Sequence, residues 1–220
     1  MQPSVILDIE TVARPWDSLA MSQQTSLLRR CESDEERAEI MGSLALWAPT
    51  GMVVAVGMMN IQSQNRMVAF LGSEECGRSG NGLLLRPFST EVELIQFAWN
   101  TLALYGTVIT FNGRGFDIPF LNLRSIAMSV PVTRKDLLGP RFSTKPHCDL
   151  LEQLTFYGLT RKFSLDFYCH AFGVQSPKGG GDGSKVGEMF RAGQVVEIAE
   201  YCAGDVLATE RLYQRWAKIL

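Results

Sequence analysis

Apolar residues come in short runs bounded by polar turns along the early part of the chain, a pattern typical of β-strands. The runs predict strands at residues 4–11, 52–61, 65–72 and 107–112. Residues 72–82 are rich in glycine and serine, so we expect a loop there. The first half of the chain therefore supplies the strands of a sheet.

Helical spacing of apolar residues predicts most of the remaining structure. The expected helices lie at residues 31–40, 89–106, 115–129, 148–158, 163–173 and 195–217. Ser89 and Thr90 can cap the second of these, and Pro119 is tolerated because it lies in the first turn of the third. Residues 130–146 read as a basic loop and residues 176–185 as a glycine-rich linker. The order of elements predicts an α/β fold with one mixed central sheet flanked by helices.

The length of the chain suits a single domain covering residues 1–220. Residues 14–50 are polar and charged, carry few fold signals, and are expected to be an insertion, a lid or a dimer contact. No apolar run approaches the roughly 18–20 residues of a membrane-spanning helix. The start of the chain lacks the pattern of a signal peptide, so we expect a cytoplasmic protein without membrane contact. The oligomeric state is not indicated.

The five cysteines are scattered and form no CxxC pair, which argues against a zinc site. We expect reduced, structural thiols. The small net charge of −2 hides a division along the chain, because residues 110–191 carry 11 Lys and Arg against 7 Asp and Glu. This basic middle segment is either a footprint for a polyanion or an unevenly charged surface.

Several carboxylates stand in otherwise apolar surroundings. Asp117 lies between Phe116 and Ile118, where an ionised group needs a partner, a metal or neutralisation. Asp8 and Glu10 flank one strand residue and therefore point to the same face, either to hold a divalent cation or to border a solvated edge. These patterns are weak when taken singly.

The predicted last helix carries a further pair. Tyr201 and Asp205 are four residues apart and therefore share one face of that helix. The pattern also suits a partly buried tyrosine beside a surface acid.

Taken together and in order, these motifs resemble the DEDD superfamily of 3′-5′ exonucleases, in its tyrosine-bearing (DEDDy) subgroup. LDIET, FNGRGFDIPFL and YCAGD look like the three motifs of the proofreading exonuclease domain of family-B DNA polymerases, here found without the polymerase. The resemblance spans nearly the whole chain and implies an RNase H-like fold. A histidine-bearing subgroup would place His where this chain has Glu200, so the tyrosine subgroup fits better.

The resemblance also implies site residues. Asp8, Glu10, Asp117 and Asp205 would hold two divalent cations, Mg²⁺ or Mn²⁺, with Asp8 shared by both. Oxygen ligands without a thiolate favour these ions over zinc. The hydroxyl of Tyr201 would orient the attacking water, since a group with a pKa of about 10 is a better hydrogen-bonding partner than base.

Other residues are expected to contact the nucleic-acid strand. Asn112 and Phe116 would shape the groove near the scissile nucleotide. Further candidates for the phosphate backbone are Arg114, Arg161, Lys162 and Lys185. The glycines at 179–183, with Lys178, either cradle a phosphate or form a linker.

Some polar residues near these motifs have structural interpretations. Asp149 is expected to cap a helix or serve the structure, and Asp166 to lie at the surface. His147 and His170 are expected to be structural, although His147 is placed where it could reach a phosphate.

The sequence therefore predicts a metal-dependent 3′-5′ exonuclease acting on nucleic acid, with single-stranded DNA as the first substrate and RNA as the alternative. The competing hypotheses are a nucleic-acid-binding module without catalysis, a subunit that needs a protein partner, and an endonuclease on the same fold.

Overall fold

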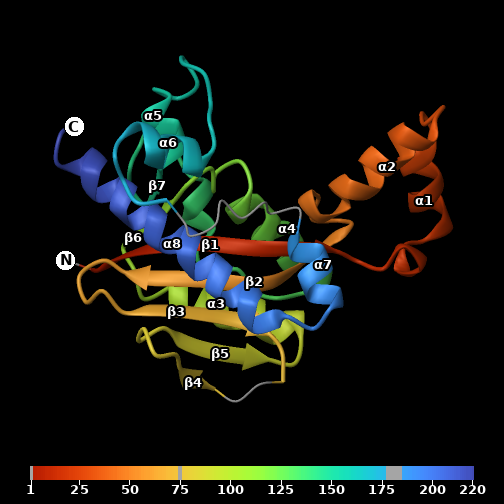
Figure 1. Ribbon diagram of the computed structural model, residues 1–220, viewed down its shortest axis with the longest axis horizontal. Coiled ribbons are helices and arrows are strands. Elements are labelled where there is room, and N and C mark those ends of the chain that lie inside the picture. Colours follow the sequence, from red (N-terminus) through yellow and green to blue (C-terminus); the bar gives the residue numbers. More distant parts are fainter. Residues whose placement is uncertain (1, 74–75, 177–184) are drawn as a thin grey trace.

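A seven-stranded mixed sheet forms the centre of the molecule (Figure 1). The computed structural model describes residues 2–73, 76–176 and 185–220. The strands lie in the order β4-β5-β3-β2-β1-β6-β7. Their bounds are β1 Ser4–Ala13, β2 Gly51–Asn60, β3 Arg66–Leu71, β4 Gly77–Arg78, β5 Leu84–Phe88, β6 Thr107–Thr110 and β7 His147–Asp149. The expected mixed sheet is confirmed, with β1 inside it, antiparallel to β2 and parallel to β6.

Helices cover both faces of this sheet (Figure 1). The long helix α8 (Val195–Ala217) crosses one face with the short α7 (Val186–Arg191), while α3 (Glu91–Leu102) and α4 (Asp117–Met128) lie on the other. Thr90 caps α3 by accepting the N–H of Glu93, as expected. Pro119 falls in the first turn of α4, also as expected.

The contact between α8 and β2 depends on a glycine. A Cβ atom at Gly57 would lie 2.7 Å from both Cys202 Sγ and Val206 Cγ2, so any side chain there would push the helix away. Glycine is common in strands where another element approaches closely. Gly57 pairs with Asp8 in β1, and the close approach therefore brings α8 over the middle of β1.

Buried polar contacts fix the helices on the opposite face. Arg124 of α4 makes a two-pronged ion pair with Glu91 of α3, with 2.6 Å between Nη2 and Oε2 and 2.9 Å between Nε and Oε1. Glu91 also accepts the backbone N–H of Val53 in β2. These contacts tie α3, α4 and the sheet together and so fix the position where α4 begins.

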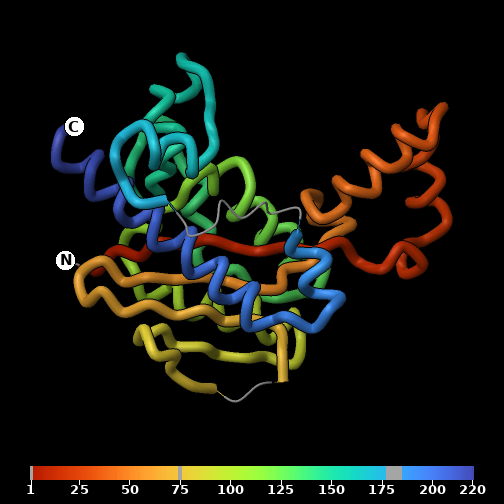
Figure 2. Tube along the Cα trace, viewed as in Figure 1, coloured from red at the N-terminus to blue at the C-terminus, as the bar shows by residue number. Residues whose placement is uncertain are grey.

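Residues 14–50 connect β1 to β2 and carry two helices, α1 (Met21–Leu28) and α2 (Asp34–Ser43), which project from the body (Figures 1 and 2). The base of this projection packs on β1, where Thr11 Oγ1 donates to the carbonyl of Ala45 at 2.8 Å. The helix at 31–40 was expected, whereas α1 was not. A role for this projection as a lid stays a prediction.

Three strands were missing from the sequence prediction. β4 lies in the segment predicted as a loop, and β5 follows that segment where no element was predicted; β5 is a strand because it pairs in parallel with β3. β7 precedes α5 (Leu150–Leu154), so the helix expected at 148–158 is shorter than predicted. The remaining helix, α6, spans Leu165–Ala171.

The described helices include none with both the length and the apolar character needed to cross a lipid bilayer. All five cysteines are free; Cys148, Cys169 and Cys202 are buried, whereas Cys31 is partly buried and Cys76 is exposed.

Candidate active site

Asp8 and Glu10 lie side by side on the face of β1 that α8 covers. Their carboxylate oxygens and Cys202 Sγ lie within 4.8 Å of one another. The regular pairing of β1 with β2 continues through Glu10 and shifts only after it, so the two acids keep the spacing of an undistorted strand. The expectation that both acids share one face is confirmed.

Asp117 reaches the same point from the start of α4. The pairing of β1 with β6 covers only Ser4 to Ile6, so β1 continues beyond the end of its neighbour. The N–H of Ile9 lies in this continuation and donates to Asp117 Oδ1 at 3.1 Å. A buried carboxylate in an apolar segment is therefore held directly against the strand that carries the other two acids.

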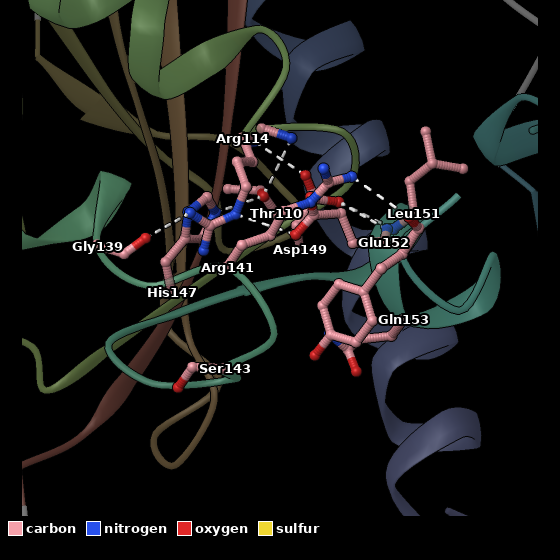
Figure 3. A network of polar contacts seen from close by, with 12 residues as sticks. Thr110, Arg114, Gly139, Arg141, Ser143, His147, Asp149, Leu151, Glu152 and Gln153 are labelled. Carbon is pink, nitrogen blue, oxygen red and sulfur yellow. Dashed lines mark hydrogen bonds and ion pairs between the residues drawn. The ribbon is translucent and has the colours of Figure 1, made fainter. Parts of the chain in front are cut away.

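The loop between β6 and α4 sets the position of Asp117. Asn112 has a left-handed backbone (φ 62°), and Gly113 packs so close to Thr110 that an added Cβ atom would lie 2.4 Å from the Thr110 Cβ. The carboxylate of Asp149 accepts the N–H group of Asn112 at 3.0 Å and that of Arg114 at 2.9 Å. Figure 3 shows Asp149 beside Arg114. The loop is thus fastened to β7 before α4 starts.

Helix α8 completes the cluster with Tyr201, Cys202 and Asp205. A hydrogen bond between Tyr201 and Asp205 acts on the pKa of both groups, which agrees with their expected position one turn apart. Cys202 Sγ lies 3.6 Å from Asp8 Oδ2 and 3.7 Å from the Asp8 carbonyl oxygen. A thiol therefore lies inside the cluster, where the sequence interpretation had assumed oxygen groups alone.

Burial and mutual repulsion control the protonation of these acids. Burial, followed by the charges of neighbouring acids, raises the pKa of Asp8 and of Glu10 well above the usual range. Burial raises the pKa of Asp117 to about 7 and that of Asp205 to about 6. Among the described residues, no Lys or Arg takes part in these shifts. The cluster therefore lacks the positive charge that its ionised form needs.

A divalent cation fits this cluster by the chemistry of its donors. Carboxylate oxygens suit Mg²⁺ and Mn²⁺, and such a cation would favour the ionised forms that burial disfavours in all four acids. Burial, followed by the neighbouring acids, also raises the pKa of Cys202. The thiol is therefore protonated and acts toward Asp8 as a weak hydrogen-bond donor.

The residues expected to contact nucleic acid occupy different positions. Asn112 is exposed, while Phe116 is partly buried and packs against Phe120 with 5.4 Å between ring centroids. Arg161, Lys162 and Lys185 are exposed.

Arg114 differs from these because its side chain is only 15% exposed. It is paired with Glu152, with 3.0 Å between Arg114 Nε and Glu152 Oε2. Contact of any of these residues with a strand stays a prediction.

Asp149 and His147 are held by the fold. Asp149 caps α5 by accepting the N–H groups of Leu151 and Glu152, as expected. His147 is buried, its Nε2 lying 2.8 Å from Thr110 Oγ1 and its Nδ1 3.0 Å from the Leu137 carbonyl oxygen. Burial lowers the pKa of His147 to about 4, so the ring is neutral. The structural interpretation of His147 is confirmed.

The remaining polar candidates either lie at the surface or fall outside the described residues. Asp166 and His170 are partly or largely exposed and pair with each other at 3.4 Å. Lys178 and the glycines at 179–183 lie outside the described residues.

The sequence interpretation missed Gly57 and Cys202. A single glycine inside an apolar strand signals close approach by another element, and this signal was available at Gly57. Cys202 is three residues before Asp205 and hence on a neighbouring helical position, which could have placed it beside the acids.

One family model matches residues 49–219, which is more than half of the chain, and is described as a predicted 3′-5′ exonuclease related to the exonuclease domain of PolB. No curated protein matches the chain. The match contains Asp117, Tyr201 and Asp205 and begins after β1, which the fold places at the centre of the same cluster. The chain therefore belongs to this family of predicted 3′-5′ exonucleases related to the exonuclease domain of PolB.

Proposed function

We propose that the protein is a metal-dependent 3′-5′ exonuclease of the tyrosine subgroup that hydrolyses phosphodiester bonds at nucleic-acid 3′ ends. Single-stranded DNA is the first proposed substrate and RNA the alternative. The observation that carries this proposal is the convergence of acids from β1, α4 and α8 whose pKa values are raised together. An uncompensated acidic cluster at the centre of a fold costs stability, and a metal-dependent reaction accounts for it.

Asp8, Glu10, Asp117 and Asp205 would hold two Mg²⁺ or Mn²⁺ ions. When bound, such ions supply the positive charge that stabilises the attacking and leaving oxygens of a phosphoryl group. The N–H of Ile9 holds the carboxylate of Asp117 in place, and the thiol of Cys202 faces that of Asp8. These contacts keep two acids oriented without occupying all of their lone pairs.

Tyr201 is proposed to orient the attacking water. Burial, followed by the charges of Asp205, Glu10 and Asp8, raises the pKa of its hydroxyl above the ordinary value, so the group stays protonated. A protonated phenol cannot serve as a base at neutral pH but can donate and accept hydrogen bonds. Replacing Tyr201 by Phe should lower the cleavage rate about 10- to 100-fold while metal binding is retained, because one orienting hydrogen bond is lost. An unchanged rate would remove this role.

The decisive experiment is cleavage of 5′-labelled single-stranded DNA in Mn²⁺ by the wild-type protein and by Asp8→Asn. The proposal predicts a ladder that shortens from the 3′ end with the wild type and no products with the variant. Asp136→Asn is the matched control, because it removes an equivalent charge from an exposed acid that pairs with Arg134 outside the cluster. Matched RNA and DNA strands of one sequence establish the preferred sugar.

Each alternative has its own outcome in this assay. Cleavage of a circular single strand, which has no end, would contradict an exonuclease and favour an endonuclease. Binding of both strands without cleavage in Mg²⁺ or Mn²⁺ would favour a binding module. Cleavage by Asp8→Asn at the wild-type rate would overturn the assignment of the metal ligands.

A further inference from the structure

A pocket of about 340 Å³ lies beside the loop that precedes Asp117. It is formed by that loop, by α5, by the segment before β7 and by the segment after α5. Its lining includes Asn112, Arg114, Arg141, Tyr157 and Lys162. Asp149 also lines it, so the pocket and the acid cluster share the loop from Asn112 to Asp117. The pocket is distinct from the cluster but directly adjoins it.

The pocket is rich in cations. Arg114 and Arg141 both reach Glu152, with Nε to carboxylate distances of 3.0 and 3.3 Å (Figure 3). Each guanidinium makes one further contact, Arg114 with the Gly139 carbonyl and Arg141 with the Tyr157 carbonyl. Arg114 Nη1 donates to the Gly139 carbonyl and Arg141 Nη2 to the Tyr157 carbonyl, whereas the buried Arg114 Nε has no hydrogen-bond partner among the described residues.

The balance of charge in the pocket favours an anion. Arg114, Arg141 and Lys162 face two carboxylates, Asp149 and Glu152. Asp149 is already enclosed by four backbone N–H groups. The three cations therefore exceed the two carboxylates by one, and Glu152 is the carboxylate that the two arginines contact.

Exposed aromatic rings border these cations. Phe142 is 71% exposed, and its ring packs edge-on against Tyr157 with 4.8 Å between centroids. The Arg141 guanidinium lies 5.7 Å from the centre of the Phe142 ring. Phe156, which precedes Tyr157 in the chain, is 56% exposed. Large aromatic side chains left in water beside arginines are characteristic of surfaces on which unpaired bases stack.

The backbone holds these rings in unusual conformations. Phe142, Phe156 and Tyr157 all have left-handed φ angles, of 70°, 49° and 60°. Bulky residues rarely adopt this region, and such conformations occur at functional sites where the surrounding fold imposes them. The exposure of Phe142 is therefore set by the backbone.

We propose that this pocket binds an unpaired nucleotide on the 5′ side of the scissile bond, its phosphate on Arg141 and Lys162 and its base against Phe142. The assignment of the 5′ side rests on the proposed exonuclease function. A strand whose 3′ terminal nucleotide occupies the acid cluster extends outward only by its 5′ part, and the loop that begins at Asn112 in the pocket ends at Asp117 in the cluster. A paired base hides its ring faces in the duplex stack, so the pocket selects single strands.

Binding can be measured without cleavage by placing every variant in an Asp8→Asn background and using a fluorescent oligothymidylate. Phe142→Ala should weaken binding about 5-fold or more, the effect of losing one stacked base, and Phe142→Tyr should restore it because the ring is kept. Arg141→Ala should lower the slope of log affinity against log salt by about 0.7, the value for one phosphate contact on a single strand. Both side chains are largely exposed, so these variants should fold.

The matched control is Arg78→Ala. Arg78 is exposed and lies on β4 at the opposite edge of the sheet, so it removes the same charge far from the pocket. The proposal predicts unchanged affinity and salt slope for this variant. An equal loss in Arg78→Ala and Arg141→Ala would mean that only net charge matters and would overturn the proposed pocket.

The remaining outcomes separate this proposal from the proposed function. Unchanged binding in the Phe142 and Arg141 variants, with cleavage by the wild-type protein intact, overturns the pocket alone. Pocket-dependent binding by a wild-type protein that never cleaves overturns the exonuclease and keeps a nucleotide pocket. Polyglutamate binding that requires Arg141 but not Phe142, without strand binding, would identify an acidic peptide as the occupant instead.

Discussion

Two buried aspartates are in contact with the loop between β6 and α4, and the fold compensates their charges differently. Asp117 is 4% exposed and Asp149 is 2% exposed. Asp149 receives four backbone N–H groups and stands at the start of α5. Asp117 receives the N–H of Ile9 and its own N–H, and its surroundings include the acids of β1.

The difference shows that burial alone does not mark a functional acid. The N–H groups around Asp149 replace the hydrogen bonds to water that burial removes, so its carboxyl group serves the structure. Burial at Asp117 is only partly offset, and its pKa stays raised to about 7. An acid whose negative charge is incompletely compensated is the better candidate for a metal ligand, since a bound metal supplies the missing positive charge.

The largest expected effect comes from Asp117→Asn. Cleavage in Mn²⁺ should fall about 10³-fold or more, because a ligand charge worth several kcal/mol to the transition state is lost. The metal-free variant should be more stable than the wild type at about pH 8, by roughly 1–4 kcal/mol, because a costly buried charge is removed. Urea unfolding in a chelator measures this. A variant that is both inactive and destabilised would contradict the comparison.

Asp149→Ala should have the opposite effect on the free energy of unfolding. Its removal leaves buried N–H groups unpaired and removes a helix cap, so the free energy of unfolding should fall by about 3 kcal/mol. Urea unfolding checks this against Asp136→Ala, whose carboxylate is 52% exposed and pairs with Arg134. We expect that control to change stability by less than about 1 kcal/mol. Equal losses in both variants would mean that Asp149 has no special structural role.

The acid cluster should also make stability depend on pH. Folding raises the pKa of Asp117 to about 7 and of Asp205 to about 6, so the folded protein binds more protons than the unfolded chain between about pH 4 and 7. The free energy of unfolding of the metal-free protein should therefore decrease as pH rises through this window. Mn²⁺ binds the deprotonated acids and should reverse the slope. Urea midpoints with a chelator and with Mn²⁺ test both signs, and parallel slopes would exclude metal binding at the cluster.

The smallest expected effect concerns Cys202. In Cys202→Ser a hydroxyl replaces the thiol as a donor toward Asp8, so cleavage in Mg²⁺ should change by less than about 10-fold. Cd²⁺ prefers sulfur ligands and should inhibit the wild type more strongly than the variant. Inhibition curves for both proteins provide the measurement. Equal sensitivity to Cd²⁺ would show that the thiol does not reach a bound ion.

Sequence patterns predicted the parts of this fold that depend on residues close together in the chain. The alternating faces of a strand put Asp8 and Glu10 together, and the helical period placed Tyr201 beside Asp205. Helix α8 has the predicted bounds, because its apolar positions repeat over many turns. These elements needed no knowledge of distant contacts.

Other elements depend on distant partners and could not be read locally. β5 contains Pro87 and follows a turn-rich segment, yet it is a strand through its parallel pairing with β3. The pairing between Asp117 and Ile9 joins residues 108 positions apart, and it arises because β1 extends beyond β6. The pocket at Arg141 likewise combines segments whose individual sequences show only a basic loop and a short helix.

The position of β1 also bears on how the protein can be divided for study. A fragment cut where the family match begins, at residue 49, would retain Asp117, Tyr201 and Asp205 but lose Asp8, Glu10 and the strand between β2 and β6. In the sequence, the projecting segment 14–50 separates β1 from the other strands. In space, β1 nevertheless lies within the sheet. A shortened linker between Ala13 and Gly51 is therefore the more conservative deletion, since it leaves the sheet whole.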